Sequence, residues 1–352
     1  MKHQMIWALT AFMLLFTSCE NDLELDRNSD HNRLALNGYI NADSLENELI
    51  VSMTDAVHPQ PVNLATVEIF VNSEKKAVAK ETEYDKGIYK FNCRFQPGDQ
   101  VKISVTTADG KHHAYVEETI PQPIENFQSA EATFMKEVQY VNNFGSQEVE
   151  DLHQIKLNFK DNGATADFYR LSINSYVTSK YTHRGYDNEP QSIFNYYDLK
   201  GRNRYICTGD PIMMEGKTFT PSSDIDFFTM NNIPNTQGIF NDILFNGKNG
   251  SISVYENYRL FEDQCNDSGY DKTELKHSIY AQVIISSLTP TAYYYLKAVN
   301  FRNSPYYDDN SDLTGPVKMP SNVHGGAGMV GFLSSKSIVV TVRGSDPYPG
   351  LK

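Results

Sequence analysis

The sequence predicts a mostly β protein with two β-rich domains, and three observations support this fold class. Short segments alternate apolar and polar residues, which is the period of a half-buried strand. Gly, Asp, Asn and Pro separate these segments at short intervals. The chain also holds 22 Tyr and 19 Phe against one Trp, and aromatic residues suit a pleated surface. With 40% hydrophobic and 21% charged residues, the composition is that of a folded chain.

The N-terminus carries the features of a lipoprotein signal peptide. Met5 to Phe16 contains no charge, but twelve helical residues reach only roughly 18 Å, short of the ~30 Å hydrocarbon core. Small residues then lead directly to Cys19, the arrangement in which a cysteine receives a diacylglyceryl group. We expect residues 1–18 to be removed and Cys19 to carry the lipid that attaches the chain to a membrane. The alternative is an ordinary secretory signal followed by an unrelated cysteine.

Residues 19–32 form an acidic tether, with carboxylates at alternate positions from Glu20 to Asp26. This segment is either a solvated linker or an export signal of the kind that directs lipoproteins to the cell surface. The formal net charge of −13 would repel nucleic acid and anionic membrane surfaces, so neither is an expected partner.

The first predicted domain spans residues 33–120 and is an immunoglobulin-like or transthyretin-like β-sandwich. Six alternating segments support it, separated by turns such as Pro97-Gly98-Asp99 and Asp109-Gly110. The segments read LALNGYI, ELIVSMTD, ATVEIFV, GIYKFNCRF, QVKISVTT and HHAYVEETI. Pro121-Gln122-Pro123 follows as a stiff connector.

The second predicted domain spans residues 124–345. Residues 154–159 and 167–180 alternate on either side of a turn sequence, which predicts a hairpin-like pair with one buried face. Residues 183–250 are irregular and polar, and loops of this length are often functional. Further strands are expected over residues 278–286 and 331–342.

Thr289-Pro290 leaves two local structures open. Thr at the N-cap and Pro at the first helical position favour a helix, with Tyr294, Lys297, Ala298 and Phe301 following at helical spacing. The alternative is a turn followed by a strand. Local propensity favours the helix.

No motif predicts catalysis, a metal or a cofactor. Gly326 to Gly331 matches G-x-G-x-x-G but lacks the strand before it and the helix after it. It is better interpreted as a bend needing positive φ or close backbone approach. Asp308 to Asp312 resembles the start of a calcium loop, but Leu313 and Met319 replace the required Gly and Glu. The histidines show no zinc-like spacing, so we expect a non-enzymatic protein.

Three cysteines remain behind Cys19. Cys207 and Cys265 lie in polar, turn-rich surroundings and could form a disulfide in an oxidising compartment. Cys93 lies in an alternating segment and is expected to be a small buried hydrophobe.

Tyrosines gather in the irregular region of the second domain. Tyr suits carbohydrate or protein surfaces because it joins a large apolar area to a polar tip. They are candidate contacts for a ligand or partner, although plain packing over a β core is the favoured explanation. The candidates are Tyr186, Tyr196, Tyr197, Tyr205, Tyr306 and Tyr307.

Several segments, in order, resemble the Bacteroidota outer-membrane lipoprotein family catalogued as domain of unknown function 4249. They are TSCEND, RLALNGYI and ETIPQP near the start, then LFNGK, LTPTAYYYLKAVN and PVKMPSNVHGGAGMVGF near the end. The resemblance covers most of the mature chain. It implies an immunoglobulin-like sandwich followed by a β-rich domain with one short helix near the C-terminus, which decides for the helix at Thr289.

The resemblance also implies a function. Members are commonly encoded beside TonB-dependent outer-membrane receptors, so we expect a surface-exposed lipoprotein of the outer membrane. It would be a non-catalytic accessory partner of such a transporter, with a small nutrient or glycan as a possible ligand. Only Cys19 carries over by position. The alternatives are a structural or adhesive β-module and a hydrolase with a dispersed site.

Overall fold

The fold is mostly β, with a short helix near the C-terminus, as predicted. The structure is a computed structural model. It describes residues 32–55, 58–142, 147–163, 165–184, 190–198, 205–207, 209–217, 233, 235–258, 276–304, 307 and 317–344. Cys19, the signal peptide and most of the acidic tether lie outside these residues, so those predictions stay predictions.

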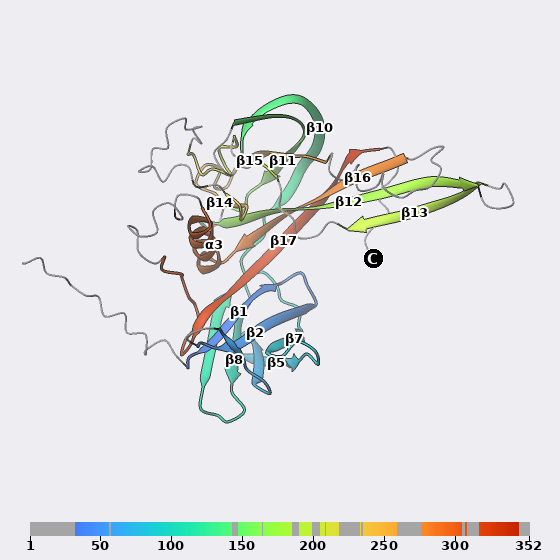
Figure 1. Cartoon of the computed structure of the whole chain (residues 1–352). Helices are drawn as coiled ribbons and strands as arrows, with labels where there is room; N and C mark the ends of the chain where they lie inside the picture. The colour runs from blue at the N-terminus through green and yellow to red at the C-terminus, as the bar shows by residue number, and fades with distance from the viewer. Residues whose placement is uncertain are drawn as a thin grey trace, which may run out of the picture.

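The described strands form one long sheet and two smaller sheets (Figure 1). The first half of the chain contributes β1 (Leu34–Asn41), β2 (Glu46–Met53), β3 (Gln60–Pro61), β4 (Thr66–Val71), β5 (Glu74–Val78), β6 (Lys80–Glu81), β7 (Ile88–Asn92), β8 (Gln100–Thr106) and β9 (His113–Thr119). The second half contributes β10 (Asn126–Val141), β11 (Gln147–Lys160), β12 (Phe168–Arg184), β13 (Pro190–Asp198), β14 (Ile239–Asn241), β15 (Asn249–Glu256), β16 (Lys276–Leu288), α3 (Pro290–Arg302) and β17 (Ala327–Arg343).

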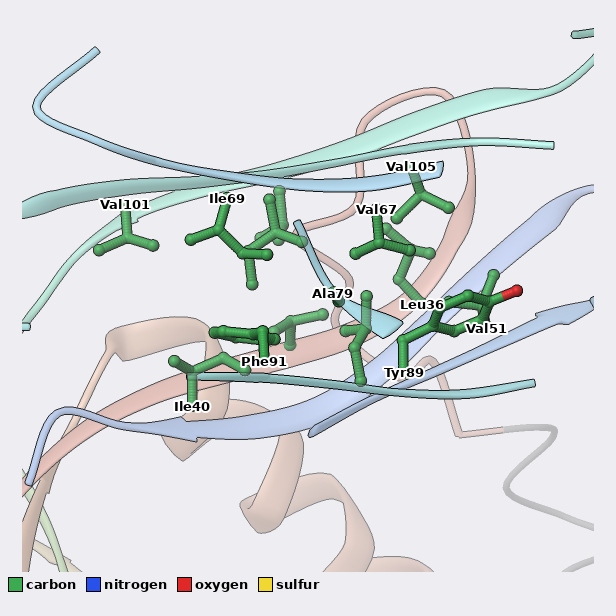
Figure 2. Packing of buried hydrophobic residues seen from close by; sticks show 14 of the residues in the cluster. Leu36, Ile40, Val51, Val67, Ile69, Ala79, Tyr89, Phe91, Val101 and Val105 are labelled. Atoms are coloured by element: carbon green, nitrogen blue, oxygen red, sulfur yellow. The ribbon is translucent and has the colours of Figure 1, made fainter. Parts of the chain in front are cut away.

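The N-terminal half is a β-sandwich. Strands β5-β4-β8-β9 form one sheet, and β1, β2, β7 and β6 form the facing end of the long sheet. Figure 2 shows apolar side chains from both layers meeting between them. Leu36, Leu49, Val67, Ile103 and Val105 are fully buried there, and each contributes about 1.5–3 kcal/mol by leaving water. The alternation seen in the sequence therefore marks the two inner faces of one core.

Strand β17 joins the two halves of the molecule. Its first part pairs in parallel with β1, and the remainder pairs antiparallel with β16. Figure 1 shows this strand running from the sandwich into the second half. The C-terminal strand of the predicted second domain thus also completes the sheet of the first.

The glycine-rich sequence makes this parallel pairing possible. A Cβ on Gly326 would lie 2.3 Å from the Leu34 carbonyl oxygen, and one on Gly328 would lie 2.2 Å from the Leu36 oxygen. Gly328 also has a φ of +96°, which favours glycine. Asn322 holds the segment by donating to the Val330 carbonyl oxygen at 2.8 Å. The interpretation as a close-approach bend is confirmed.

The second half contains a separate core between β12, β16 and β17 on one side and the β10-β11-β15 sheet on the other. The predicted hairpin of residues 154–159 with 167–180 is wrong. Strand β11 pairs with β10 and β15, whereas β12 pairs with β13, β14 and β16. Both segments alternate because they face the same core from opposite sheets.

Helix α3 begins where the sequence predicted. Thr289 is the N-cap, and Pro290 is at the first helical position. The Thr289 hydroxyl makes no capping bond, and within the described part of the chain it is buried without a hydrogen-bond partner. The helix buries Ala292, Leu296 and Asn300, spaced by four residues, against the body of the protein.

A candidate ligand pocket beside helix α3

A cavity of about 410 Å³ lies beside α3. Its walls come from the helix, from residues 213–217, from residues 233–239 and from residues 318–320. The volume falls within the ~300–1,000 Å³ that small-molecule sites occupy. These wall segments are far apart in the sequence, so only the folded chain assembles the cavity.

The helix presents a second stripe of residues to this cavity. Tyr294, Lys297, Ala298 and Phe301 line it, the same residues whose spacing predicted the helix. The opposite stripe packs into the protein. The helix therefore has one face for the core and another for the cavity, with Asn300 at the boundary of both, and sequence spacing alone does not distinguish the two faces.

Glu215 is the anionic group of the wall and is held by three donors. Lys297 Nζ lies 2.6 Å from Oε2, Asn241 Nδ2 lies 2.9 Å from Oε1, and the Tyr293 hydroxyl also donates to Oε1. Glu215 has a φ of +51°, a conformation that costs an L residue about 1–2 kcal/mol. Its hydrogen bonds to α3 and β14 offset that cost and hold residues 209–217 against the helix.

Two asparagine side chains hold the wall segments of the cavity together by hydrogen bonds. Asn235 Nδ2 donates to the carbonyl oxygens of Met213 at 2.8 Å and Ile239 at 2.6 Å. Its Oδ1 accepts from the Ile239 N–H at 3.0 Å and from Asn300 Nδ2 at 3.2 Å. Asn300 is buried, and its Oδ1 accepts from Thr236 Oγ1 and the Gln237 N–H. These hydrogen bonds connect residues 209–217, residues 235–239 and α3 within the protein itself, without a ligand.

The cavity is apolar inside and cationic at its exposed edge. Met213, Met214 and Ile239 are buried, while Lys217 and Lys318 are exposed. The described lining holds three lysines and one glutamate, a local excess of two positive charges. The whole chain carries −13, so this local charge is opposite to that of the protein.

Three carboxylates meet at a second location, between β11, β12 and the turn after β14. One oxygen each from Asp161, Asp167 and Asp242 lies within 4.8 Å of the others. Desolvation raises the pKa of Asp167 and Asp242, and the Asp161 carboxylate raises both further. Asp161 accepts from the Gly247 N–H at 2.7 Å and from the Tyr169 hydroxyl. Among the described residues, Asp167 Oδ2 is buried without a hydrogen-bond partner. No local sequence pattern marks this cluster, because it depends on a contact between residues far apart in the chain.

Of the predicted tyrosine contacts, the structure describes the side chains of Tyr205 and Tyr307, and neither lines the cavity. Tyr205 is 6% exposed, and its hydroxyl donates to the Leu171 carbonyl oxygen at 2.7 Å, so it belongs to the second core. Tyr307 is half-buried and packs its ring 5.6 Å from that of Phe301. Tyr196 and Tyr197 lie on β13. Tyr186 and Tyr306 lie outside the described residues.

The cysteines have different environments. Cys207 is buried, and burial raises the pKa of its thiol to about 12. Its predicted disulfide partner Cys265 lies outside the described residues, so the bridge stays a prediction. Cys93 is partly buried and packs against the first core, which agrees with its expected role. The acidic segment 308–312 is also outside the described residues.

Sequence comparison identifies the family. The family described as Domain of unknown function (DUF4249) matches residues 20–338. The chain belongs to the DUF4249 family. The match begins directly behind Cys19 and ends within β17, so it includes both halves of the fold and every wall of the cavity. No curated protein matches the chain.

Two solved structures show a remote likeness to this chain. A DUF4785 family protein from Legionella pneumophila is 8% identical, with 71% of this chain and 51% of that chain covered and a TM-score of 0.20. A Corynebacterium diphtheriae protein assigned as membrane anchored is 10% identical, with 91% and 61% covered and a TM-score of 0.19. The DUF4249 chain thus spans about half to three fifths of their lengths. In its described part, no helix has the length and apolar character needed to cross a membrane.

Proposed function

We propose that this DUF4249 protein is a lipid-anchored, surface-exposed lipoprotein of the outer membrane. In this proposal it acts without catalysis as the accessory binding partner of a TonB-dependent transporter in nutrient uptake. The observation that carries the binding role is the cavity beside α3, whose walls are joined by hydrogen bonds within the protein itself. Preformed walls reduce the ordering cost of binding a ligand.

The polar groups of the cavity support binding more than chemistry. Glu215, Tyr293 and Lys297 could serve as acid, base or nucleophile in an enzyme. Here they bond to one another, so each group is already engaged in holding the wall.

The anchor and the transporter rest on the sequence. Cys19 follows a short apolar run and small residues, and two or three acyl chains on such a cysteine give stable membrane attachment. The acidic tether would give the folded body reach. Partnership with a TonB-dependent transporter is what the family resemblance implies.

A mild-detergent pull-down from native membranes tests the partnership. We expect the tagged wild-type protein to copurify with an outer-membrane β-barrel in near-stoichiometric amount. A lone monomer would instead favour a structural or adhesive module. Turnover of a hydrolase substrate, lost on changing a single His or Asp, would favour an enzyme.

The anchor is tested separately by fractionation. Cys19→Ala should move the protein from the membrane fraction to the soluble fraction, because the substitution removes the acylation site. Unchanged sedimentation with membranes would refute the lipid anchor.

A further inference from the structure

We propose that the cavity beside α3 binds a small organic anion that has one carboxylate on an apolar body, such as a medium-chain fatty acid. This inference rests on the proposed binding function and names its ligand class. The carboxylate would lie at the exposed lysine edge, and the apolar body would lie against the buried methionines.

The apolar interior selects for hydrocarbon. Met213, Met214 and Ile239 are each no more than 6% exposed, and Ala298, Phe301 and Pro320 extend the same surface. Methionine side chains adapt to ligands of varied shape. Each CH₂ group transferred from water to such a surface improves affinity about threefold to fourfold, so the body of the ligand supplies most of the affinity.

The edge of the cavity selects for negative charge. Lys297 is paired with Glu215 at 2.6 Å. In the described part of the chain, neither Lys217 nor Lys318 has a carboxylate within salt-bridge distance. Two exposed ammonium groups therefore face a cavity whose only anionic described wall residue is already neutralised. A carboxylate would complement them.

The state of the amide groups argues against a sugar. A glycan needs many free donors and acceptors to replace the water around its hydroxyls. Both N–H groups of Asn235 Nδ2 donate to carbonyl oxygens of the protein, and Asn235 Oδ1 accepts two hydrogen bonds. The Asn300 oxygen also accepts two. These amides hold the wall, so the cavity favours an amphipathic anion over a polyhydroxy ligand.

Calorimetric titration with three eight-carbon probes tests the proposal. Octanoate, 1-octanol and octylammonium share one chain length and differ in the charge of the head group. The titration uses the full chain carrying Cys19→Ala, so that neither lipid nor detergent competes with the probe. We expect octanoate to bind one-to-one and at least tenfold more tightly than either other probe. Equal binding of octanoate and octanol, or no saturable binding of octanoate, would overturn the proposal.

Two kinds of variant locate the binding site. Lys217→Glu combined with Lys318→Glu should abolish the preference for octanoate, whereas Lys86→Glu in the sandwich should leave it unchanged. Changing either Lys217 or Lys318 alone to Gln should weaken octanoate binding about twofold to fivefold, which is the range for an exposed ion pair. Ala298→Trp should fill the cavity and remove binding of all three probes. If Ala298→Trp does not fold, the lysine variants still decide the question.

The two proposals can fail separately. Octanoate binding without a copurified β-barrel would retain the ligand class and reject the transporter partnership. A copurified β-barrel with no octanoate binding would retain the partnership and reject the ligand class.

Discussion

The join between the two halves can be tested at Gly328. Replacement by alanine places a Cβ 2.2 Å from the Leu36 carbonyl oxygen of the neighbouring strand, at a φ of +96°. Positive φ costs an alanine about 1–2 kcal/mol, and forcing two packed strands apart costs about 1–3 kcal/mol more. We expect Gly328→Ala to lower the free energy of unfolding by roughly 2–5 kcal/mol.

Gly110→Ala provides a matched control. Gly110 has a φ of +68°, and a Cβ there would meet nothing within 4 Å. Gly110→Ala should lower the free energy of unfolding only by the cost of placing alanine at positive φ, about 1–2 kcal/mol. The difference between the two variants isolates the close approach of β1 and β17.

Urea unfolding followed by far-ultraviolet circular dichroism measures both variants. Fluorescence from the many tyrosines provides a second probe of the same transition. If the two variants unfold within about 0.5 kcal/mol of each other, β1 and β17 are not in tight contact at Gly328. The parallel pairing described above would then be refuted.

Three other substitutions test other parts of the fold. Asp167→Asn should stabilise the protein by roughly 1–3 kcal/mol at pH 7.5 in the presence of a chelator, because carboxylates within 4.8 Å repel by about 1–3.5 kcal/mol per pair. Since the folded-state pKa of Asp167 is raised by desolvation and its acidic neighbours, ionisation penalises the folded wild type above that pKa. The advantage of the variant should therefore shrink as pH falls towards the ordinary Asp pKa of 3.8, and an advantage that grows on acidification would contradict this. Tyr89→Phe should lower the free energy of unfolding in urea by about 1–3 kcal/mol. The buried Tyr89 hydroxyl donates to the Val62 carbonyl oxygen and accepts from the Ala65 N–H, both at 2.8 Å. An unchanged free energy of unfolding would mean that water takes the place of the hydroxyl in the variant. Leu296→Ala should lower the free energy of unfolding, measured by thermal unfolding, by about 2–5 kcal/mol. Leu296 is buried beneath α3, so the substitution leaves a void there. A loss under about 1 kcal/mol would place that face of the helix at the surface.

Local sequence signals predicted the strands of the sandwich, but the expectation that residues 183–250 are irregular is wrong where β13 and β14 form. Alternation located the strands of the sandwich because each inward position is buried, as at Val67 and Ile69. Thr289-Pro290 favoured a helix because the backbone of the N-cap residue is extended and Pro suits the first turn, and the family resemblance decided for it. The glycine-rich sequence indicated close approach. In each case a few adjacent residues carry the physical cause.

Pairing and sites were not predictable in the same way. Alternation in residues 154–159 and 167–180 shows that each segment has a buried face, but the same pattern fits two strands of one sheet and two strands facing each other. The cavity depends on Glu215 meeting Lys297, and the carboxylate cluster on Asp161 meeting Asp242. No local pattern marks such contacts.

By itself, therefore, the sequence determined the strands of the sandwich, favoured a helix at Thr289-Pro290, and indicated that a cysteine behind a short apolar run is the expected anchor. Only the tertiary structure decided that β17 completes the N-terminal sheet and that one stripe of α3 lines a cavity. The physical reason is range: periodicity and capping act between neighbours in the chain, whereas strand order and cavity walls depend on which distant surfaces bury each other.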